Sequence, residues 1–255
     1  QSMANVIRML ADNEKVKSIV LNIDSPGGSV DGTVDVGAAV EYAKSKKNVI
    51  AYVDGLCASA AYRIAVNANS IIAKQGSIIG SIGTMFQLVD DTEAQQKRGY
   101  KLITINADAS SEKNLAVDLA KNGDASVLKQ ELLNPINDLF LADVRKARPQ
   151  VNESALKGST YISSKAKSLG LIDEEALLPD IIASELNKIE SKKSSMKFFN
   201  KLAQFLGLEQ MSDQTQLNAE QLEKLEGMQE MHLNAIAERE ATIEQQLNTI
   251  QSKEN

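Results

Sequence analysis

Residues 18–29 read SIVLNIDSPGGS, and this stretch decides the fold. Its first seven residues are mostly apolar, which is typical of a buried strand, and the segment Ser25-Pro26-Gly27-Gly28 then forms a turn. A helical pattern follows from about Val30 to Lys46. A buried strand, a glycine-rich turn and a helix in this order indicate one unit of a parallel α/β sheet.

The same alternation of strand and helix continues along the chain. A strand at 49–53 leads through a tight turn at Asp54-Gly55 into a helix that begins near Ser59. The remaining predicted elements are strands at 70–73, 82–88 and 101–105, a helix at 93–98, and a long helix from residue 125 to about 146. Together they predict a mostly parallel α/β sheet with flanking helices.

Composition excludes several classes of protein. The 255 residues carry a net charge of −6, which argues against a general surface for nucleic acid or anionic membrane. A single cysteine, Cys57, excludes an internal disulfide framework and suits a reducing compartment. No apolar run approaches the ~20 residues of a membrane span. Because the chain enters a helical pattern almost at once, we expect its natural N-terminus to lie upstream.

Charge places the domain boundary near residue 190. Residues 196–255 hold 5 basic and 10 acidic residues, whereas the preceding 195 hold 23 and 24. We expect a compact domain over 1–190, a linker with a short amphipathic segment over 191–217, and an acidic helical or partly disordered tail over 218–255. The stretch from Lys192 to Ser195 is the predicted linker.

The chain has one histidine, His232, and it lies in the tail. A Ser-His-Asp triad or a Cys-His pair needs an imidazole beside the nucleophile, so neither is easily built here. If the compact domain carries a nucleophilic serine, we expect a lysine as its base.

Two segments could form such a site. Gly27 and Gly28 can turn their amides toward an anion or an oxyanion at a helix N-terminus, although an ordinary strand-to-helix turn would have the same sequence. Ser59 lies where a strand meets a helix, and the amide of Ala60 could form part of an oxyanion hole. The alternative for Ser59 is a helix N-cap, and Cys57 beside it is expected to be a small packed residue rather than a second nucleophile.

A third segment, GSIIGSIGT at residues 76–84, can present its backbone to an extended peptide. The motifs DSPGG (24–28), ASAAY (58–62) and GSIG (80–83), with a closing segment at 161–173, resemble the signal peptide peptidase A family of serine peptidases. That family is related in fold to the Clp protease proteolytic subunit and the crotonases. The resemblance covers roughly residues 5–185.

The resemblance implies a serine endopeptidase with a Ser-Lys dyad and with no metal or cofactor. Ser59 matches the nucleophile, Gly28 and Ala60 match the oxyanion-hole residues, and Lys113 is the lysine at the position of the family's general base. The implied substrate-binding residues are Gly27, Ser81, Ile82 and Gly83. Because a lysine in water has a pKa of ~10.4, Lys113 must be buried to act as a base.

The acidic tail favours one biological role over others. A family peptidase fused to such a tail resembles the head-maturation proteases of phages and prophages, which cleave scaffold or capsid proteins and themselves. We therefore expect a homo-oligomer with capsid and scaffold partners and no nucleic acid, acting in the cytoplasm inside a procapsid. One alternative is a cellular peptidase for signal peptides or membrane-protein fragments, anchored through a missing N-terminal segment. The other alternative is a non-enzymatic, self-associating scaffold with a degenerate dyad.

Overall fold

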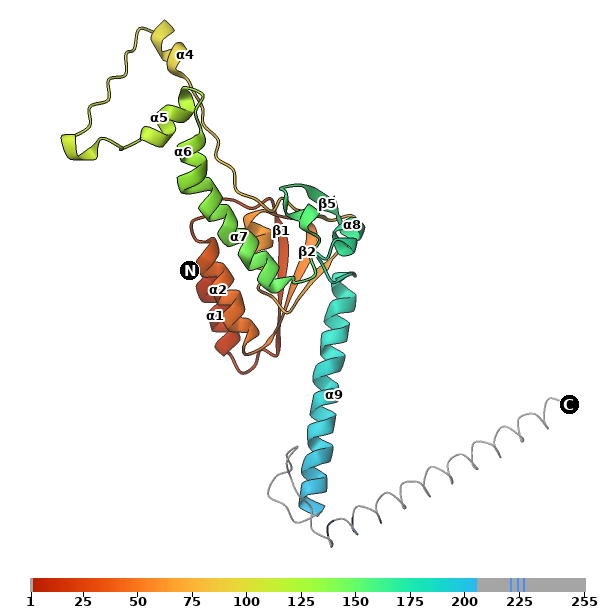
Figure 1. Cartoon of the computed structure of the whole chain (residues 1–255). Helices are drawn as coiled ribbons and strands as arrows, with labels where there is room; N and C mark the ends of the chain where they lie inside the picture. Colours follow the sequence, from red (N-terminus) through yellow and green to blue (C-terminus); the bar gives the residue numbers. More distant parts are fainter. Residues whose placement is uncertain (1, 206–220, 222–223, 225–226, 228–255) are drawn as a thin grey trace, which may run out of the picture. The chain divides into compact units, whose positions relative to one another are not determined.

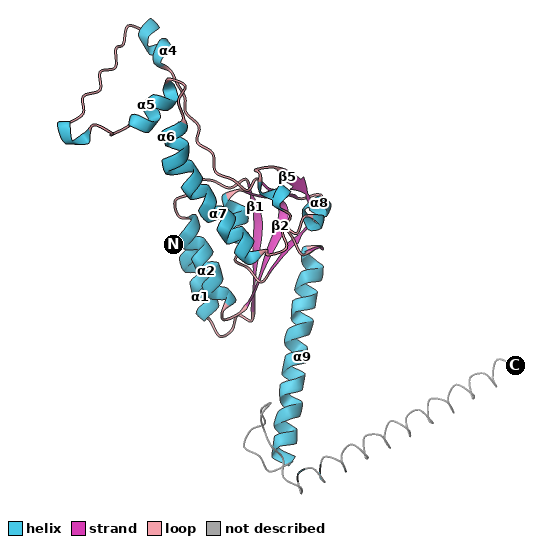
Figure 2. Cartoon of the chain, viewed as in Figure 1, coloured by secondary structure: helices cyan, strands magenta, loops and turns pink. Residues whose placement is uncertain are grey.

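A computed structural model describes residues 2–205 together with 221, 224 and 227. The chain divides into two units, residues 1–185 and 186–255. The first unit contains a six-stranded sheet with helices packed around it (Figures 1 and 2). The strands are β1 (Ser18–Ser25), β2 (Asn48–Ala58), β3 (Ser70–Ala73), β4 (Ile78–Gly80), β5 (Thr160–Ile162) and β6 (Glu174–Glu175).

Strand β2 is the centre of this sheet. The strand order is β5-β4-β2-β3-β6, and β1 also pairs with β2. Every pairing is parallel except that of β4 with β5. The mostly parallel α/β sheet expected from the sequence is therefore confirmed.

The tight turn expected at Asp54-Gly55 is wrong, because β2 continues through these residues to Ala58. The register between β1 and β2 shifts after Ile23, and the Asp24 carboxylate accepts a hydrogen bond of 3.0 Å from the amide of Leu56. The second half of β2 then pairs with β4 instead of β3. This shift brings the end of β2 beside both the DSPGG turn and β4.

Helices cover the sheet and bury its apolar side chains. The helical elements are α1 (Met3–Asp12), α2 (Thr33–Lys44), α3 (Ala60–Ala65), α4 (Thr92–Lys97), η1 (Asp108–Ser110), α5 (Leu115–Lys121), α6 (Ser126–Leu128), the π-helical η2 (Lys129–Leu133), α7 (Asn134–Ala147), η3 (Glu153–Leu156), α8 (Ser163–Ser168) and α9 (Leu178–Phe205). Tyr52, Tyr62, Ile71, Ile79 and Leu171 are among the largest fully buried side chains.

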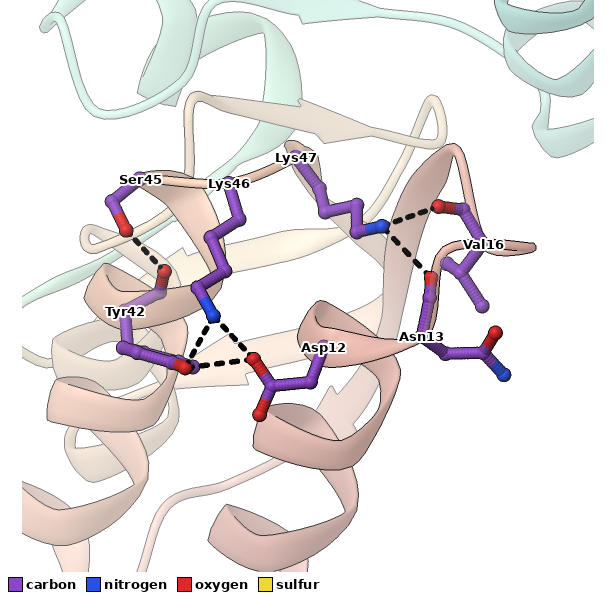
Figure 3. A network of polar contacts seen from close by, with 7 residues as sticks. All are labelled: Asp12, Asn13, Val16, Tyr42, Ser45, Lys46 and Lys47. Carbon is purple, nitrogen blue, oxygen red and sulfur yellow. Dashed lines mark hydrogen bonds and ion pairs between the residues drawn. The ribbon is translucent and has the colours of Figure 1, made fainter.

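Helices α1 and α2 lie side by side and are joined by a polar network at their C-terminal ends (Figure 3). The Tyr42 hydroxyl donates a hydrogen bond of 2.7 Å to the carboxylate of Asp12. The Lys46 ammonium donates to the same carboxylate and to the Tyr42 oxygen, and it lies 4.4 Å from the centre of the Tyr42 ring. The network fixes the position of α1 against the helix that follows the DSPGG turn.

The strands expected at 82–88 and 101–105 are wrong. The strand in this region is β4, which ends at Gly80, and every residue from 85 to 115 is exposed. Figure 2 shows this segment as loop broken by short helices. The alternating apolar pattern is present, but no strand of the described residues pairs with it, and an isolated strand leaves its backbone hydrogen bonds unmade.

Helix α9 passes through the predicted linker without interruption, so the stretch 192–195 is helical. No glycine or proline occurs between residues 180 and 206, so the sequence contains no strong helix breaker there. The boundary between the two units falls after Glu185, five residues before the predicted position. The predicted tail over 218–255 lies almost wholly outside the described residues.

Candidate active site

The ends of β1, β2 and β4 converge on one cavity of about 880 Å³. Parallel strands end at the same edge of a sheet, so the loops that follow them gather there. Seven residues singled out from the sequence line this cavity: Gly27, Gly28, Ser59, Ala60, Ser81, Ile82 and Gly83. The structure thus brings together three segments that are separated by up to 56 residues in the chain.

Ser59 occupies a sharp turn between β2 and α3. Its backbone has φ 51° and ψ −123°, a conformation that residues other than glycine rarely adopt. The amide donates a hydrogen bond of 2.9 Å to the carbonyl oxygen of Gly80, which ties the turn to β4. Ser59 is the N-cap residue of α3, as the alternative predicts, but its side chain makes no capping hydrogen bond to the helix, and Ser59 lines the cavity.

Gly27 packs directly against this turn. A Cβ atom at residue 27 would lie 2.7 Å from the carbonyl oxygen of Ala58, 2.8 Å from the Ser59 Cβ and 2.9 Å from the Ala60 nitrogen. Gly27 also has a positive φ of 97°. Only glycine fits here, because both the backbone conformation and the close approach exclude a side chain.

The amides of Gly28 and Ala60 are free to hold an oxyanion. Neither donates a hydrogen bond to any of the described residues. Ala60 begins helix α3, and the first amides of a helix have no partner within it. Donors of this kind, placed beside a serine hydroxyl, can stabilise the negative charge of a tetrahedral intermediate.

The segment after β4 is held on two sides. Ser81, with φ 51°, donates from its amide to the carbonyl oxygen of Ser159 at 2.8 Å. The Thr84 amide donates to the Asn137 Oδ1 atom at 3.1 Å. Residues 81–84 therefore form a fixed wall of the cavity, beside Ser59.

The sequence did not identify the far wall of the cavity. It consists of Lys129, Leu133, Asn134, Ile136, Asn137 and Phe140 on η2 and α7, with Leu156, Lys157 and Gly158 before β5. The helical spacing of 129, 133, 137 and 140 indicates that they share one helix face, but nothing in that spacing tells which way the face points.

Arg63 also lines the cavity, and its charge is balanced. Its Nε and Nη2 atoms lie 2.8 and 2.7 Å from Oδ2 of Asp143. The guanidinium carbon is 5.7 Å from the centre of the Phe140 ring. These contacts join α3 to α7 across the cavity.

Cys57 is a packed residue, as expected. It is fully buried, and burial raises the pKa of its thiol to about 12. The reactive thiolate is therefore almost absent at neutral pH. Burial also raises the pKa of Tyr62, whose hydroxyl donates 2.7 Å to the carbonyl oxygen of Leu171 and anchors α3 to the closing segment.

The structure does not bring Lys113 to Ser59 within one chain. Lys113 is exposed in the segment 85–115 and does not line the cavity. Its backbone is held locally: its amide donates to Ser110 at 3.1 Å, and its carbonyl accepts from Asn106 at 3.2 Å. The lysines that do line the cavity are Lys129 and Lys157.

Two further properties of the described part of the chain bear on its chemistry. Its cysteine, aspartate and glutamate residues form no group of three or more that could hold a metal ion, and the chain's one histidine, His232, lies outside the described residues. Within residues 2–205 no helix combines the length and the apolar character needed to cross a membrane.

Comparisons with known proteins agree with this geometry. A sequence model described as peptidase family S49 matches residues 41–191, and one described as Clp protease matches residues 1–75. The chain is 31% identical over 173 residues to a protease of Methanocaldococcus jannaschii, which covers 67% of this chain and 55% of that protein. It is 29% identical over 197 residues to Protease 4 of Salmonella typhi, which covers 73% of this chain and 31% of that protein.

The chain thus spans about half, or less, of the length of these relatives. Among solved structures, a 1510-N membrane-bound stomatin-specific protease matches with a TM-score of 0.48 and 17% identity, over 71% of this chain and 74% of that one. The fold is the Clp protease/crotonase-like α/β fold, with a curled mixed sheet and flanking helices.

Proposed function

We propose, from the premise that the chain belongs to peptidase family S49, that it is a serine endopeptidase with Ser59 as nucleophile. The observation that carries the proposal is the convergence of the Ser59 turn, the free amides of Gly28 and Ala60 and the fixed segment 81–84 on one cavity. An extended substrate would lie along residues 81–84 and present its carbonyl carbon to the Ser59 hydroxyl.

The reaction follows from these positions. The Ser59 oxygen attacks the peptide carbonyl while a base accepts its proton, and the amides of Gly28 and Ala60 bind the oxyanion. The protonated base then gives its proton to the leaving amine, and water hydrolyses the acyl-enzyme.

We assign the base to Lys113, whose exposure sets a condition on the mechanism. A lysine becomes a base near neutral pH only when it is desolvated, so another part of the protein must cover it. Either the segment 85–115 closes over its own cavity, or it places Lys113 in the cavity of a second copy. The second arrangement agrees with a homo-oligomer.

The biological role that we propose is head maturation in a phage or prophage. The enzyme would act in the cytoplasm, inside a procapsid, and would cleave scaffold or capsid proteins and its own C-terminal region. The acidic composition of residues 196–255 supports this role. The matched relatives are proteases of cellular organisms, which favours a cellular signal-peptide or membrane-fragment peptidase as the second candidate.

The position of Lys113 keeps one further alternative open, a non-enzymatic scaffold with a degenerate dyad. A serine-directed fluorophosphonate separates this alternative from the enzyme. Labelling of the wild type at Ser59, absent in Ser59→Ala, is expected of the enzyme. A wild type that does not react supports the scaffold.

Intact mass spectrometry of the full chain over time tests the proposal. The wild type is expected to lose a C-terminal fragment by cleavage near residues 190–215. Ser59→Ala is expected to stay whole, and Lys113→Ala to cleave about 10²- to 10⁴-fold more slowly. Lys101→Ala removes an exposed lysine of the same segment and is expected to cleave like the wild type.

Each of the other possible outcomes of this experiment leads to a different conclusion. Cleavage by Lys113→Ala at the wild-type rate shows that the base lies elsewhere. Cleavage restored by mixing the Ser59→Ala and Lys113→Ala proteins shows that one copy supplies the serine and another the lysine. A wild type that stays intact but cleaves a signal peptide favours the cellular candidate.

A further inference from the structure

The cavity beside Ser59 carries an excess of positive charge. Its lining includes Arg63, Lys129 and Lys157 and no aspartate or glutamate. In the whole chain acidic residues outnumber lysine and arginine by 34 to 28. The composition of the chain therefore does not account for the sign of this surface.

The excess comes from the two lysines. Asp143 balances the charge of Arg63, as described above. Lys129 and Lys157 take part in none of the ion pairs or side-chain hydrogen bonds formed among residues 2–205. Both are exposed at the cavity surface, where a bound group of opposite charge can reach them.

The lysines come from different elements, with apolar side chains in the same cavity. Lys129 begins η2, and Lys157 lies between η3 and β5. The apolar lining includes Val30, Leu133, Ile136, Phe140 and Leu156. A peptide with a carboxylate near an apolar side chain therefore matches the cavity in both charge and polarity.

We propose that Lys129 and Lys157 select peptide substrates that carry aspartate or glutamate next to an apolar residue close to the scissile bond. This selectivity rests on the proposed peptidase function and specifies its substrate class. The chain contains such sequences in its own C-terminal region, where the net charge is −5: Leu208-Glu209, Leu222-Glu223, Leu225-Glu226 and Ile243-Glu244.

Binding of a labelled peptide tests the proposal without requiring cleavage. The probe is a fluorescent peptide with the sequence of residues 202–217, LAQFLGLEQMSDQTQL, and its partner carries Glu209→Gln and Asp213→Asn. Both are titrated by fluorescence anisotropy against the full chain with Ser59→Ala. The chain's own tail competes equally with both peptides, so it does not change the ratio of their affinities.

We expect the acidic peptide to bind about three- to tenfold more tightly at low salt, and this preference to shrink as sodium chloride is added. Lys129→Met and Lys157→Met should each reduce the preference by about two- to threefold, and the double variant should abolish it. The matched arginine substitutions keep the positive charge and should retain the preference. Lys167→Met, which removes an exposed lysine of α8, should leave it unchanged.

Equal affinity for the two peptides overturns the proposal. So does a preference that survives the double methionine substitution, or one that the arginine variants lose. Cleavage of the same peptides by the wild-type chain is a separate readout. An acid preference in binding without any cleavage contradicts the peptidase proposal and leaves the selectivity of the cavity standing.

Discussion

At Ser59 the backbone prepares the side chain for chemistry. The left-handed turn directs the chain from β2 into α3, and the hydrogen bond to Gly80 holds it there. A serine in the usual N-cap conformation would give its oxygen to the first amides of the helix. Here the hydroxyl makes no such bond, so both the hydroxyl and the Ala60 amide remain available to a substrate.

Two neighbouring glycines provide a test of this arrangement at the scale of one residue. Gly27→Ala places a methyl group 2.7 Å from a backbone oxygen and in a left-handed conformation, whereas a Cβ at Gly28 meets no atom within 4 Å. We expect Gly27→Ala to lower the free energy of unfolding by about 1–3 kcal/mol and to abolish labelling of Ser59 by a fluorophosphonate.

Thermal unfolding and intact-mass labelling measure both effects. Gly28→Ala is the control for stability and should unfold at the wild-type temperature. Equal melting temperatures for Gly27→Ala and the wild type would show that the Gly27 backbone does not pack against the Ser59 turn.

The sequence predicts those parts of the candidate site that lie at the ends of strands. Gly27 and Ser59 each follow a strand that the sequence predicts, and parallel strands end at a common edge, so sequence order was enough to bring these two together. Ser81 follows β4, whereas the sequence placed the strand after this residue, at 82–88. Lys129, Asn137 and Lys157 come from a helix and a loop whose direction depends on tertiary packing. The position of Lys113 could not be predicted from the sequence, because the surrounding segment is fully exposed and has no buried face that would fix its place in the fold.

At the scale of the elements, the polar network between α1 and α2 predicts how the stability of the protein depends on pH. Hydrogen bonds from Lys46 and Tyr42 lower the pKa of Asp12 below its ordinary 3.8, and the bond to Asp12 raises the pKa of Lys46 above its ordinary 10.5. The stabilisation is fully present between those ordinary values. It is lost as the pH falls through the lowered pKa of Asp12 or rises through the raised pKa of Lys46.

We therefore expect Asp12→Asn to lower the melting temperature slightly at pH 7, and this effect to shrink as the pH falls through the lowered pKa of Asp12 and its carboxyl becomes protonated. Scanning calorimetry from pH 2.5 to 8 measures the difference. Glu14→Gln removes an exposed acid outside this network and should change little at any pH. A difference that does not shrink between pH 8 and pH 2.5 would contradict the ionic contribution.

The elements also show where sequence patterns succeed. Strand β3 has the predicted bounds, and β1 differs by one residue. The apolar side chains of β3 are buried, and those of β1 are buried or partly buried, because both strands pair within the sheet. Residues 101–105 have an equally good strand pattern but lack a pairing partner among the described residues. β-propensity reflects packing on a sheet, so it fails where no sheet is present.

On the scale of the whole molecule, the segment 85–105 stands out among the described residues by its exposed apolar side chains. Among its exposed apolar residues, Met85, Val89, Leu102 and Ile105 are each about four-fifths exposed. Large apolar surfaces of this kind usually mark a protein interface. We interpret the segment as the contact between copies in the proposed homo-oligomer.

The double substitution Ile103→Asp with Ile105→Asp should shift the protein toward monomer in analytical ultracentrifugation, by at least about tenfold in the dissociation constant. If Lys113 acts in the cavity of a second copy, the double variant should also cleave more slowly, because it associates less. Met3→Asp places the same charge on an exposed apolar position of α1 and is the control. Unchanged association in the double variant would exclude this segment as the interface.

The backbone at Ser59 has a consequence for how this sequence is maintained over generations. A left-handed serine costs about 1–3 kcal/mol relative to a relaxed residue, and glycine would remove most of that strain. Mutational drift filtered by stability alone would thus tend to replace Ser59 with glycine, which has no hydroxyl. A lineage that keeps serine at this position is being selected for something other than a stable fold.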